Sequence, residues 1–378
     1  MLHRIGDIYA ERSERGAANM ELLSVTMNGG VMQRSEIEGK DNSSEDKSSY
    51  KVVRKGDMVY NSMRMWQGAN GISSYDGIVS PAYTVLTAKR PICNDYFAAL
   101  FKNYKLINEF RKNSQGMTSD TWNLKYPQIE TIKVYLPEVE EQKKVASILV
   151  TLDRRIAAQA TLVEQLKKYK RGLLFREFEL TTHDTSNIKY IGKLHDFFSL
   201  SSGSTPHSTN KAFYSGSIRW VSSGELKPKY LCETNQHISS DAVSSCNLRE
   251  YPANTLLIAM YGLEAAGVRG TASILSVPAT ISQACMAIQQ TGEIDIEYLY
   301  YWYIYNGQWI GIRIAQGTKQ QNLSTDTLGK LKIYAPSYSK QKEACKLLSQ
   351  IDNLIEKESH KIDLLSSVKK GLLQQLFI

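Results

Sequence analysis

The sequence of 378 residues predicts an α+β fold: two mixed α/β domains in a pseudo-twofold arrangement, separated by two long antiparallel coiled-coil helices. Two observations carry this prediction. One segment of the sequence, called the repeated phrase below, occurs twice. In both copies the apolar residues are spaced alternately three and four positions apart, which is the spacing of a coiled-coil helix. The stretch before each copy instead has short β-branched and aromatic runs separated by Gly and Pro, a pattern typical of strands.

The repeated phrase begins at Tyr135 and again at Tyr334, and the two copies align without a gap. Matching pairs include Pro137 and Pro336, Gln142 and Gln341, Asp153 and Asp352, Leu166 and Leu365, and Gly172 and Gly371. A fainter match continues upstream, where Ile5-Gly6-Asp7-Ile8 corresponds to Ile191-Gly192-Lys193-Leu194. A repeat of this length indicates one architecture used twice.

Each copy of the phrase predicts a helix, and a helix over 142–178 would be about 55 Å long. A proline precedes each helix, where it is tolerated, and no proline lies inside. The apolar residues at heptad spacing form a seam along each helix. Two equal seams in one chain pack most economically on each other. We expect the packing to be made by Leu149, Leu152, Ile156, Gln159, Leu166, Leu348, Ile351, Ile355, Glu358 and Leu365.

Both seams are interrupted by polar residues at matching positions, Gln159 and Glu358 at one and Lys170 and Lys369 at another. In an antiparallel pair, Gln159 and Glu358 would meet near the centre and could fix the register. The alternative is that both are solvated. The run Lys167, Lys168, Lys170 and Arg171 is either a solvated face or a contact to DNA backbone or an acidic partner surface.

The segments before the helices predict mixed α/β domains. We expect strands at 51–53, 58–61 and 83–87, and in the second half at 218–221, 255–260 and 284–288. Helices are expected at 96–110 and 297–310. The second helix is rich in tyrosine, and an aromatic stripe at helical spacing usually belongs to a core.

Composition and charge narrow the class of protein. A hydrophobic content of 42% excludes wholesale disorder, and a mean hydropathy of −0.34 without a long apolar run excludes a membrane-spanning helix. The start has no apolar segment of the signal-peptide type, and the five cysteines form no CxxC pair, so we expect a cytoplasmic protein without disulfides. The net charge of +8 favours a polyanionic partner, but mildly.

Motifs for catalysis are missing from the sequence. It has no Walker A loop, no GxGxxG, no Pro-Pro loop of the aminomethyltransferase type and no HxxxH, so we expect neither a catalytic site nor a bound metal or cofactor. Glu141-Gln142-Lys143 offers an acid-x-Lys pair of the nuclease type, but no acidic partner on a preceding strand accompanies it. A nuclease with an unrecognised site therefore stays only as an alternative.

The duplicated phrase resembles the specificity subunit of type I restriction-modification enzymes. The features that carry the resemblance are an aromatic-x-Pro, a Gln-Lys, the apolar seam, the matching aspartates and the Gly-Leu-Leu ending. The phrases at 213–221 and 316–323 are similar to family phrases too. The resemblance covers essentially the whole chain, but Arg15-Gly16 is not followed by the Thr-Pro of the family. Since the chain starts abruptly at its first phrase, we expect a short N-terminal stretch to be missing relative to longer relatives.

The resemblance implies four parts: a first target recognition domain at 1–137, a central spacer helix at 138–184, a second target recognition domain at 185–336 and a C-terminal spacer helix at 337–378. Each domain would read one half of a split, asymmetric site on double-stranded DNA. The helices would set the unread spacer and dock two methyltransferase subunits. S-adenosylmethionine would bind to those subunits, and ATP and magnesium to restriction motor-nuclease subunits where these are present.

Residues that read DNA are commonly Arg, Lys, Asn, Gln, Ser and Thr on loops. The predicted DNA-binding residues are Asn61, Ser62, Arg64, Gln67, Arg111, Lys112, Thr118, Ser204, Thr205, Lys211, Ser222, Ser223, Tyr261, Arg269, Lys319 and Gln320. Trp66 either stacks on DNA or belongs to the core. The competing interpretations are a coiled-coil adaptor whose variable domains bind protein, and a specificity subunit of a methylation-only complex.

Overall fold

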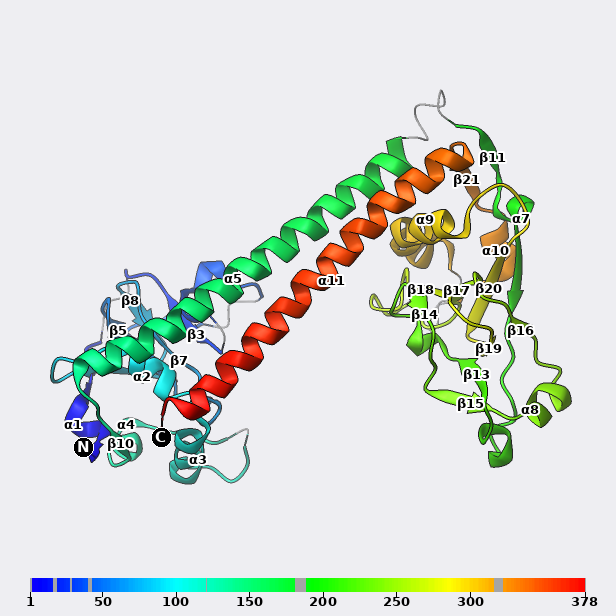
Figure 1. Cartoon of the computed structure of the whole chain (residues 1–378). Helices are drawn as coiled ribbons and strands as arrows, with labels where there is room; N and C mark the ends of the chain where they lie inside the picture. Colours follow the sequence, from blue (N-terminus) through cyan, green and yellow to red (C-terminus); the bar gives the residue numbers. More distant parts are fainter. Residues whose placement is uncertain are drawn as a thin grey trace. The chain divides into compact units, whose positions relative to one another are not determined.

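The computed structural model describes residues 2–15, 19–27, 29–39, 43–119, 121–180, 188–315 and 322–377. The chain divides into two compact units: unit 1 comprises Met1–Thr161 with Ser359–Ile378, and unit 2 comprises Leu162–Glu358. Each unit contains one domain of strands and short helices together with a segment of each long helix (Figure 1). Within the described ranges, no helix is both long and apolar enough to cross a membrane.

Unit 1 is built on an antiparallel sheet in the order β2-β9-β6-β7, beside the pairs β1-β10, β3-β4 and β5-β8. Its elements are β1 Leu2–Arg4, α1 Ile5–Ile8, β2 Tyr9–Glu11, β3 Leu23–Thr26, β4 Gly30–Gln33, η1 Arg34–Glu36, β5 Lys51–Val53, β6 Met58–Asn61, η2 Met65–Gln67, β7 Asn70–Ile72, β8 Gly77–Val79, β9 Tyr83–Ala88, α2 Asn94–Leu100, α3 Tyr104–Asn113, α4 Tyr126–Ile129 and β10 Lys133–Tyr135. Because strand side chains alternate between faces, Met58 and Tyr60 enter a core with α2 and α3, whereas Val59 enters a second core with β3 and β5.

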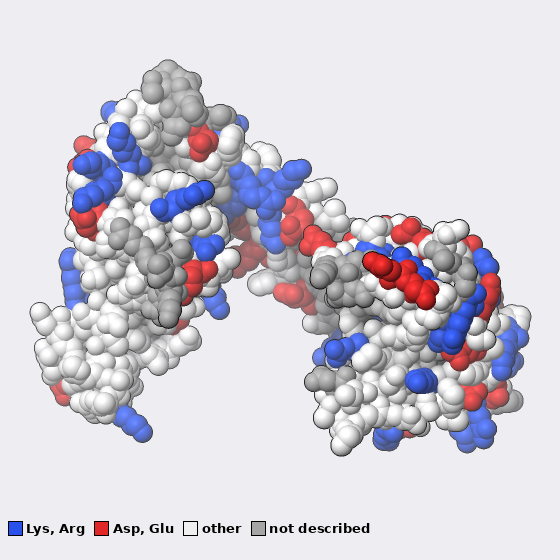
Figure 2. Space-filling model, turned by 180° about the vertical axis from the view of Figure 1, so that it is seen from behind, with Lys and Arg blue, Asp and Glu red and all other residues white. Residues whose placement is uncertain are grey.

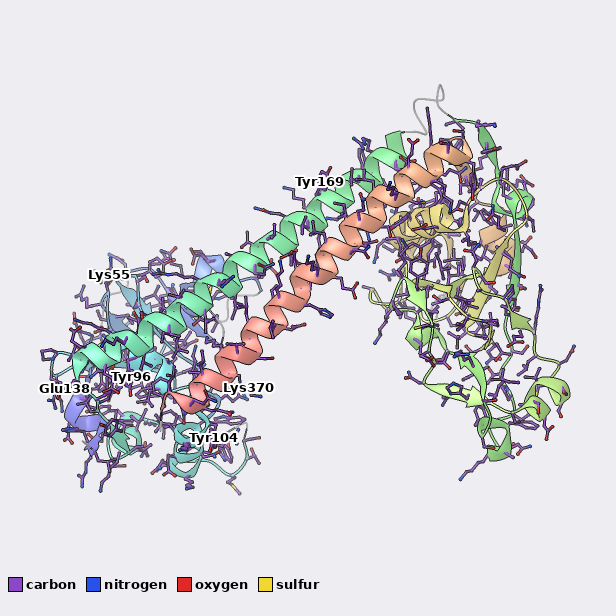
Figure 3. All side chains as sticks on the ribbon, viewed as in Figure 1. Lys55, Tyr96, Tyr104, Glu138, Tyr169 and Lys370 are labelled. Atoms are coloured by element: carbon purple, nitrogen blue, oxygen red, sulfur yellow. The ribbon has the colours of Figure 1, made fainter. Side chains whose placement is uncertain are left out.

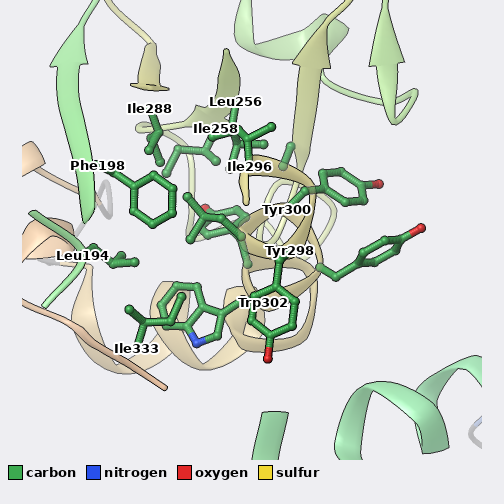
Figure 4. Packing of buried hydrophobic residues seen from close by; sticks show 14 of the residues in the cluster. Leu194, Phe198, Leu256, Ile258, Ile288, Ile296, Tyr298, Tyr300, Trp302 and Ile333 are labelled. Atoms are coloured by element: carbon green, nitrogen blue, oxygen red, sulfur yellow. The ribbon is translucent and has the colours of Figure 1, made fainter. Parts of the chain in front are cut away.

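Unit 2 has a five-stranded sheet in the order β12-β20-β17-β18-β14 and a four-stranded sheet in the order β15-β13-β19-β16. Its domain elements are β11 Tyr190–Lys193, α7 Leu194–Phe197, β12 Phe198–Ser202, η5 Lys211–Tyr214, β13 Ile218–Val221, η6 Ser223–Glu225, β14 Tyr230–Leu231, β15 Gln236–Ile238, α8 Ser240–Ser245, β16 Glu250–Tyr251, β17 Leu256–Ala259, β18 Ala272–Leu275, β19 Ala279–Ile281, β20 Cys285–Gln290, α9 Ile296–Trp309, η7 Ile310–Ile314, α10 Thr325–Gly329 and β21 Lys332–Ala335. Leu256 and Ile258 of β17 pack with the aromatic residues of α9, such as Tyr298 and Trp302 (Figure 4).

The two domains repeat one topology. The order β2-β9-β6-β7 of unit 1 corresponds to β12-β20-β17-β18 of unit 2, and the pair β1-β10 corresponds to β11-β21. Unit 2 adds β14, which pairs parallel with β18. The predicted class of mixed helix and sheet with two long helices is confirmed, and the internal repeat extends through both domains.

The predicted strands are confirmed, with end shifts of at most two residues. The predicted helix over 96–110 is wrong in one respect, because the structure has two helices there, α2 and α3. Asn103 breaks the helix: its backbone is extended, and its side-chain oxygen accepts a hydrogen bond from the Lys105 N–H as an N-cap. Its amide also donates to the Leu373 carbonyl at 2.7 Å, which ties this break to the C-terminal helix. The tyrosine-rich helix α9 is buried, as predicted.

The long helices are α5, Val139–Phe175, which continues into the π-helix η3, Arg176–Leu180, and α11, Tyr338–Gln375. Each begins with the same anchor. The buried Gln142 amide donates to the Pro137 carbonyl, and its oxygen accepts from the Cys93 N–H. Gln341 does the same with the Pro336 carbonyl and the Asp295 N–H. Each glutamine therefore joins the start of its long helix, through a backbone N–H group, to the domain of the same unit.

Segments of α5 and α11 run antiparallel in each unit. Asp153 of α5 pairs with Lys369 of α11 in unit 1, and Lys170 of α5 pairs with Asp352 of α11 in unit 2. Residue numbers therefore increase along α5 in the direction in which they decrease along α11. All ten predicted packing residues are buried or half-buried. Glu358 is only 6% exposed, so the solvated alternative is wrong for it. That Glu358 meets the half-buried Gln159 stays a prediction.

Candidate nucleic-acid interface

The loop between β6 and β7 of unit 1 carries the first group of predicted DNA-binding residues. Met65 anchors it in the core, and Gly68 closes it with a φ of 84°, which glycine adopts without strain. Arg64 is exposed and Gln67 is half-buried. Asn61, also half-buried, uses its side-chain oxygen to accept the backbone N–H two residues further on, which fixes the start of the loop.

Trp66 of this loop lies in a cluster with Trp122 and Arg111. The two indole rings meet edge to face with centroids 5.3 Å apart, and the Arg111 guanidinium lies 5.6 Å from the Trp66 ring centroid. Both tryptophans are half-buried, so Trp66 is not a core residue. Indole rings beside exposed guanidinium groups offer both stacking for a base and charge for a phosphate.

The other predicted residues of unit 1 have different surroundings. The prediction that Ser62 binds DNA is corrected, because the β-strand alternation turns its side chain inward. Ser62 is 4% exposed, and its hydroxyl hydrogen-bonds the Thr84 hydroxyl at 2.8 Å. Lys112 is exposed in the last turn of α3 and pairs with Glu109 at 2.7 Å. Thr118 is exposed on the loop that leads to Trp122.

Three loops of unit 2 meet at one edge of its domain. The Ser204 N–H donates to the Ile281 carbonyl, and the Ser282 N–H donates to the Val221 carbonyl. Gly203 makes this approach possible, since a Cβ there would lie 2.3 Å from the Ile281 carbonyl oxygen. The exposed Ser204 and its neighbour therefore come close to the loop that follows β13.

The side chains on these loops differ in exposure and in the hydrogen bonds that they make within the chain. Thr205 is exposed, and its hydroxyl accepts the Gln283 N–H at 3.3 Å. Ser222 is half-buried, and its hydroxyl and its backbone N–H both donate to the Glu225 carboxylate of η6, at 2.7 and 2.9 Å. Ser223 is half-buried. The structure thus brings the four predicted hydroxyl residues of this edge together, but uses the Ser222 hydroxyl internally.

Tyr261 and Arg269 lie on the loop between β17 and β18, which is the equivalent of the β6–β7 loop in unit 1. Tyr261 is exposed. Arg269 is instead folded inward: its guanidinium donates to the Leu263 carbonyl at 2.6 Å and to the Glu264 carbonyl at 2.9 Å. Arg269 therefore shapes this loop, and its guanidinium is largely engaged in doing so.

Lys211 is exposed as the first residue of η5. Lys319 and Gln320 lie outside the described residues. Sequence reasoning missed Trp122, and its position just after a Gly-, Ser- and Thr-rich loop was the signal that could have found it. An aromatic residue beside such a loop can reach the surface, whereas helical spacing would have placed it in a core.

The charge distribution suits a mild attraction to a polyanion. On the face shown in Figure 2, Lys and Arg side chains are interspersed with Asp and Glu on both units. The basic run on α5 is mixed in character: Lys168 and Arg171 are exposed, Lys167 pairs with Glu164, and Lys170 is half-buried in its ion pair with Asp352. The exposure of Lys168 and Arg171 fits both the solvated interpretation and a contact to DNA or a partner, whereas the solvated interpretation is wrong for Lys170.

One group of metal-ligand types occurs among the described residues, formed by Asp295, Glu297 and Cys345. Lys342 pairs with Asp295 at 2.7 Å, and Lys229 pairs with Glu297 at 2.5 Å, so both carboxylates already have cationic partners. Burial raises the pKa of the Cys345 thiol, which disfavours the thiolate that a metal would need. The group is best explained as a buried ion-pair network.

The paired helices carry a second apolar surface beside their seam. Ile148, Leu162 and Tyr169 of α5 each precede a seam residue in the heptad, and so do Leu347, Leu354 and Val368 of α11; all are exposed. In an antiparallel pair, these equivalent flanking positions of the two helices lie on the same side. Tyr169 projects from α5 (Figure 3). The opposite side is covered in unit 2, where Tyr301 donates to Asp352.

A domain and helix pair used twice, with cationic and aromatic loops in one unit and hydroxyl-rich loops in the other, is the architecture expected of a two-part nucleic-acid reader. Comparison with known proteins agrees: residues 20–168 and 189–366 both match the family model of the type I restriction modification DNA specificity domain. The chain therefore belongs to this family.

Two curated relatives and one solved structure show the extent of the likeness. The MjaVIII specificity subunit of Methanocaldococcus jannaschii is 25% identical over 358 residues, which cover 86% of this chain and 79% of that subunit. The MjaIX specificity subunit of the same organism is 27% identical over 192 residues, which cover 50% of this chain but only 43% of that subunit. The crystal structure of the type I S subunit from M. genitalium has the same fold, with a TM-score of 0.62, 16% identity and coverage of 100% and 96%.

Proposed function

We propose that this chain is the DNA-recognition subunit of a type I restriction-modification enzyme, and that it reads a split, asymmetric site with an unread spacer. The observation that carries the proposal is that the two domains share one fold but carry different loops. The two domains have the same strand order, yet their equivalent hairpin loops differ in length and side chains: the β6–β7 loop holds Arg64 and Trp66, while the β17–β18 loop holds Tyr261 and Arg269. Different loops on one frame would read two different half-sites.

The helix pair would serve the partners of this subunit. Apolar patches of this kind, bordered by charged residues, are typical of protein–protein interfaces. Since each unit exposes such residues on both of its helix segments, two copies of one partner could bind, one to each unit. We propose that these partners are two methyltransferase subunits, with motor-nuclease subunits added where the system has them.

The chemistry would then be carried by other chains. S-adenosylmethionine would bind to the methyltransferase subunits, and ATP and magnesium to the motor-nuclease subunits. The nature of the side chains supports this division, since the exposed loops supply hydroxyl, guanidinium and indole groups suited to binding. Action on DNA also implies that the protein works in the cytoplasm.

Co-expression with cognate methyltransferase subunits, followed by methylation sequencing of host DNA, tests the proposal. The expected result is one bipartite motif with two different halves and a constant spacer. Replacing residues 185–336 by the matching domain of another subunit should change one half of the motif only. Methylation that required no bipartite motif, or a swap that changed both halves, would contradict the proposal.

A further inference from the structure

An ion pair between the two long helices is made twice with corresponding residues. Lys170 and Lys369 occupy the same place in the sequence repeat, and so do Asp153 and Asp352. In unit 2, the Lys170 Nζ lies 2.5 Å from the Asp352 carboxylate; in unit 1, the Lys369 Nζ lies 2.5 Å from the Asp153 carboxylate. Both lysines interrupt the apolar seam and are half-buried, so their charges need these partners.

The heptad makes this pairing specific to one register of the helices. If α11 slid by one heptad along α5, Lys170 would face Cys345 or Ser359 instead of Asp352. The apolar seam alone would tolerate such a shift, because it repeats every seven residues. The shift would leave half-buried ammonium groups without a counter-ion at both places, which is costly. The two ion pairs thus discriminate between registers that the apolar seam does not distinguish.

In unit 2 the ion pair is also tied to the recognition domain. The Tyr301 hydroxyl of α9 donates to the second oxygen of Asp352 at 2.8 Å, and its ring lies 5.5 Å from the Lys170 Nζ. Lys229, just before β14, reaches both the Tyr301 hydroxyl at 2.8 Å and the Ser349 hydroxyl of α11 at 3.1 Å. These contacts fix the position of the domain on the helices as well as the register.

Among the residues of unit 1 that the structure describes, no tyrosine makes this second connection. Cys93 and Asp295 both donate their N–H groups to the anchoring glutamine of their helix, and this equivalence places Ala99 where unit 2 has Tyr301. A groove of about 920 Å³, lined by Ala99, Lys102 and Asp153 among others, lies beside the helices in unit 1. Asp153 is accordingly more exposed than Asp352, at 55% against 25%.

We propose that Lys170–Asp352 and Lys369–Asp153 are positioning pairs that hold the helices in one register and thereby fix the spacer length between the two half-sites. This inference rests on the proposed function. The pair in unit 2 dominates, because within the described ranges it is joined to its domain by a tyrosine and the pair in unit 1 is not.

Methylation sequencing of the co-expressed complex tests this inference with charge-reversal variants. The wild type is expected to methylate sites with one spacer length. Lys170→Asp places two carboxylates against each other and should lower methylation at that spacer at least tenfold, with new sites at other spacer lengths and unchanged half-sites. Combining it with Asp352→Lys restores the pair with reversed polarity and should return the original spacer. Lys346→Asp, an exposed change of the same charge on α11, is the matched control.

A purely structural role would lower methylation without creating new spacers, and that result, or a failure of the double variant to restore the original spacer, would overturn the inference. Tyr301→Phe keeps the ring and removes only the hydroxyl, so it tests the domain connection in a chain that still folds. It should broaden the spacer distribution without changing the half-sites, and a distribution identical to the wild type would count against the connection.

A DNA-independent measurement separates this inference from the proposed function. In thermal unfolding of the full chain, Lys170→Asp and Asp352→Lys should each lower Tm, and the double variant should recover most of the loss. Recovery together with a wild type that methylates no bipartite site would overturn the proposed function and leave the register pairs standing. Additive losses would overturn the register pairs themselves.

Discussion

Replacing Gln341 by alanine should loosen the junction between α11 and the domain of unit 2. Gln341 is fully buried, accepts the Asp295 N–H at 2.8 Å and donates to the Pro336 carbonyl at 2.9 Å. Asp295 is itself buried, and so is Pro336, so water cannot replace either bond. Each buried backbone group left without a partner costs about 1–3 kcal/mol, which gives about 2–6 kcal/mol for the two.

The equivalent change in unit 1 provides an internal scale. Gln142 makes the same two bonds, but Cys93 is only half-buried, so its N–H can recover part of the loss from water. Gln142→Ala should therefore cost less than Gln341→Ala. Gln350→Ala, an exposed change of the same type on α11, should stay within about 0.5 kcal/mol of the wild type.

Hydrogen exchange followed by mass spectrometry on the full chain can locate these losses, because it reports local opening in each unit separately. Peptides around 293–299 and 336–345 should exchange faster in Gln341→Ala, and peptides around 91–97 and 137–145 in Gln142→Ala. The reasoning would be refuted if Gln341→Ala behaved like Gln350→Ala, or if Gln142→Ala were the more damaging of the two.

Three further predictions concern binding and the junction of unit 1. Trp66→Ala should weaken DNA binding by the complex about 5- to 150-fold, since loss of stacking on one base costs about 1–3 kcal/mol, whereas Lys55→Ala, an exposed change at the opposite end of β6, should have a small effect; equal effects in fluorescence anisotropy would count against stacking. Leu354→Asp should reduce co-purification of the methyltransferase subunits without lowering the Tm of the isolated chain, and undiminished capture would remove this surface from the interface. Asn103→Ala removes the cap of α3 and the bond to the Leu373 carbonyl, so it should destabilise unit 1 by about 1–3 kcal/mol in denaturant unfolding; a loss confined to unit 2 would contradict this.

The repeated pattern made much of the fold predictable. A seam of apolar residues at heptad spacing depends only on local sequence, so α5 and α11 could be placed to within a few residues. The break between α2 and α3 could not, because Asn103 is held by a carbonyl some 270 residues away in the chain. Local propensity favours one helix at that point, and a tertiary contact decides otherwise.

The candidate interface was less predictable for a related reason. Residue type suggests what a side chain can bind, but its free hydrogen-bonding groups depend on the fold. Ser62 and Arg269 are suitable types, yet one is buried against Thr84 and the other holds its own loop. The sequence marked Lys170 as an interruption of the seam and matched Asp352 to Asp153, but only the antiparallel alignment shows that these residues are partners.

Unit 1 is discontinuous in sequence, and this has a consequence for synthesis. The C-terminal segment of the chain packs Phe377, which lies just beyond α11, against Tyr96, with ring centroids 5.1 Å apart, and Leu372 and Leu373 of α11 against the same core. The residues of unit 2 form one uninterrupted stretch and can fold as soon as they leave the ribosome. The domain that is translated first keeps an apolar face uncovered until residues 359–377 have been synthesised. It is thus the last to be completed, and it is the part of the nascent chain with the longest exposure to chaperones and proteases.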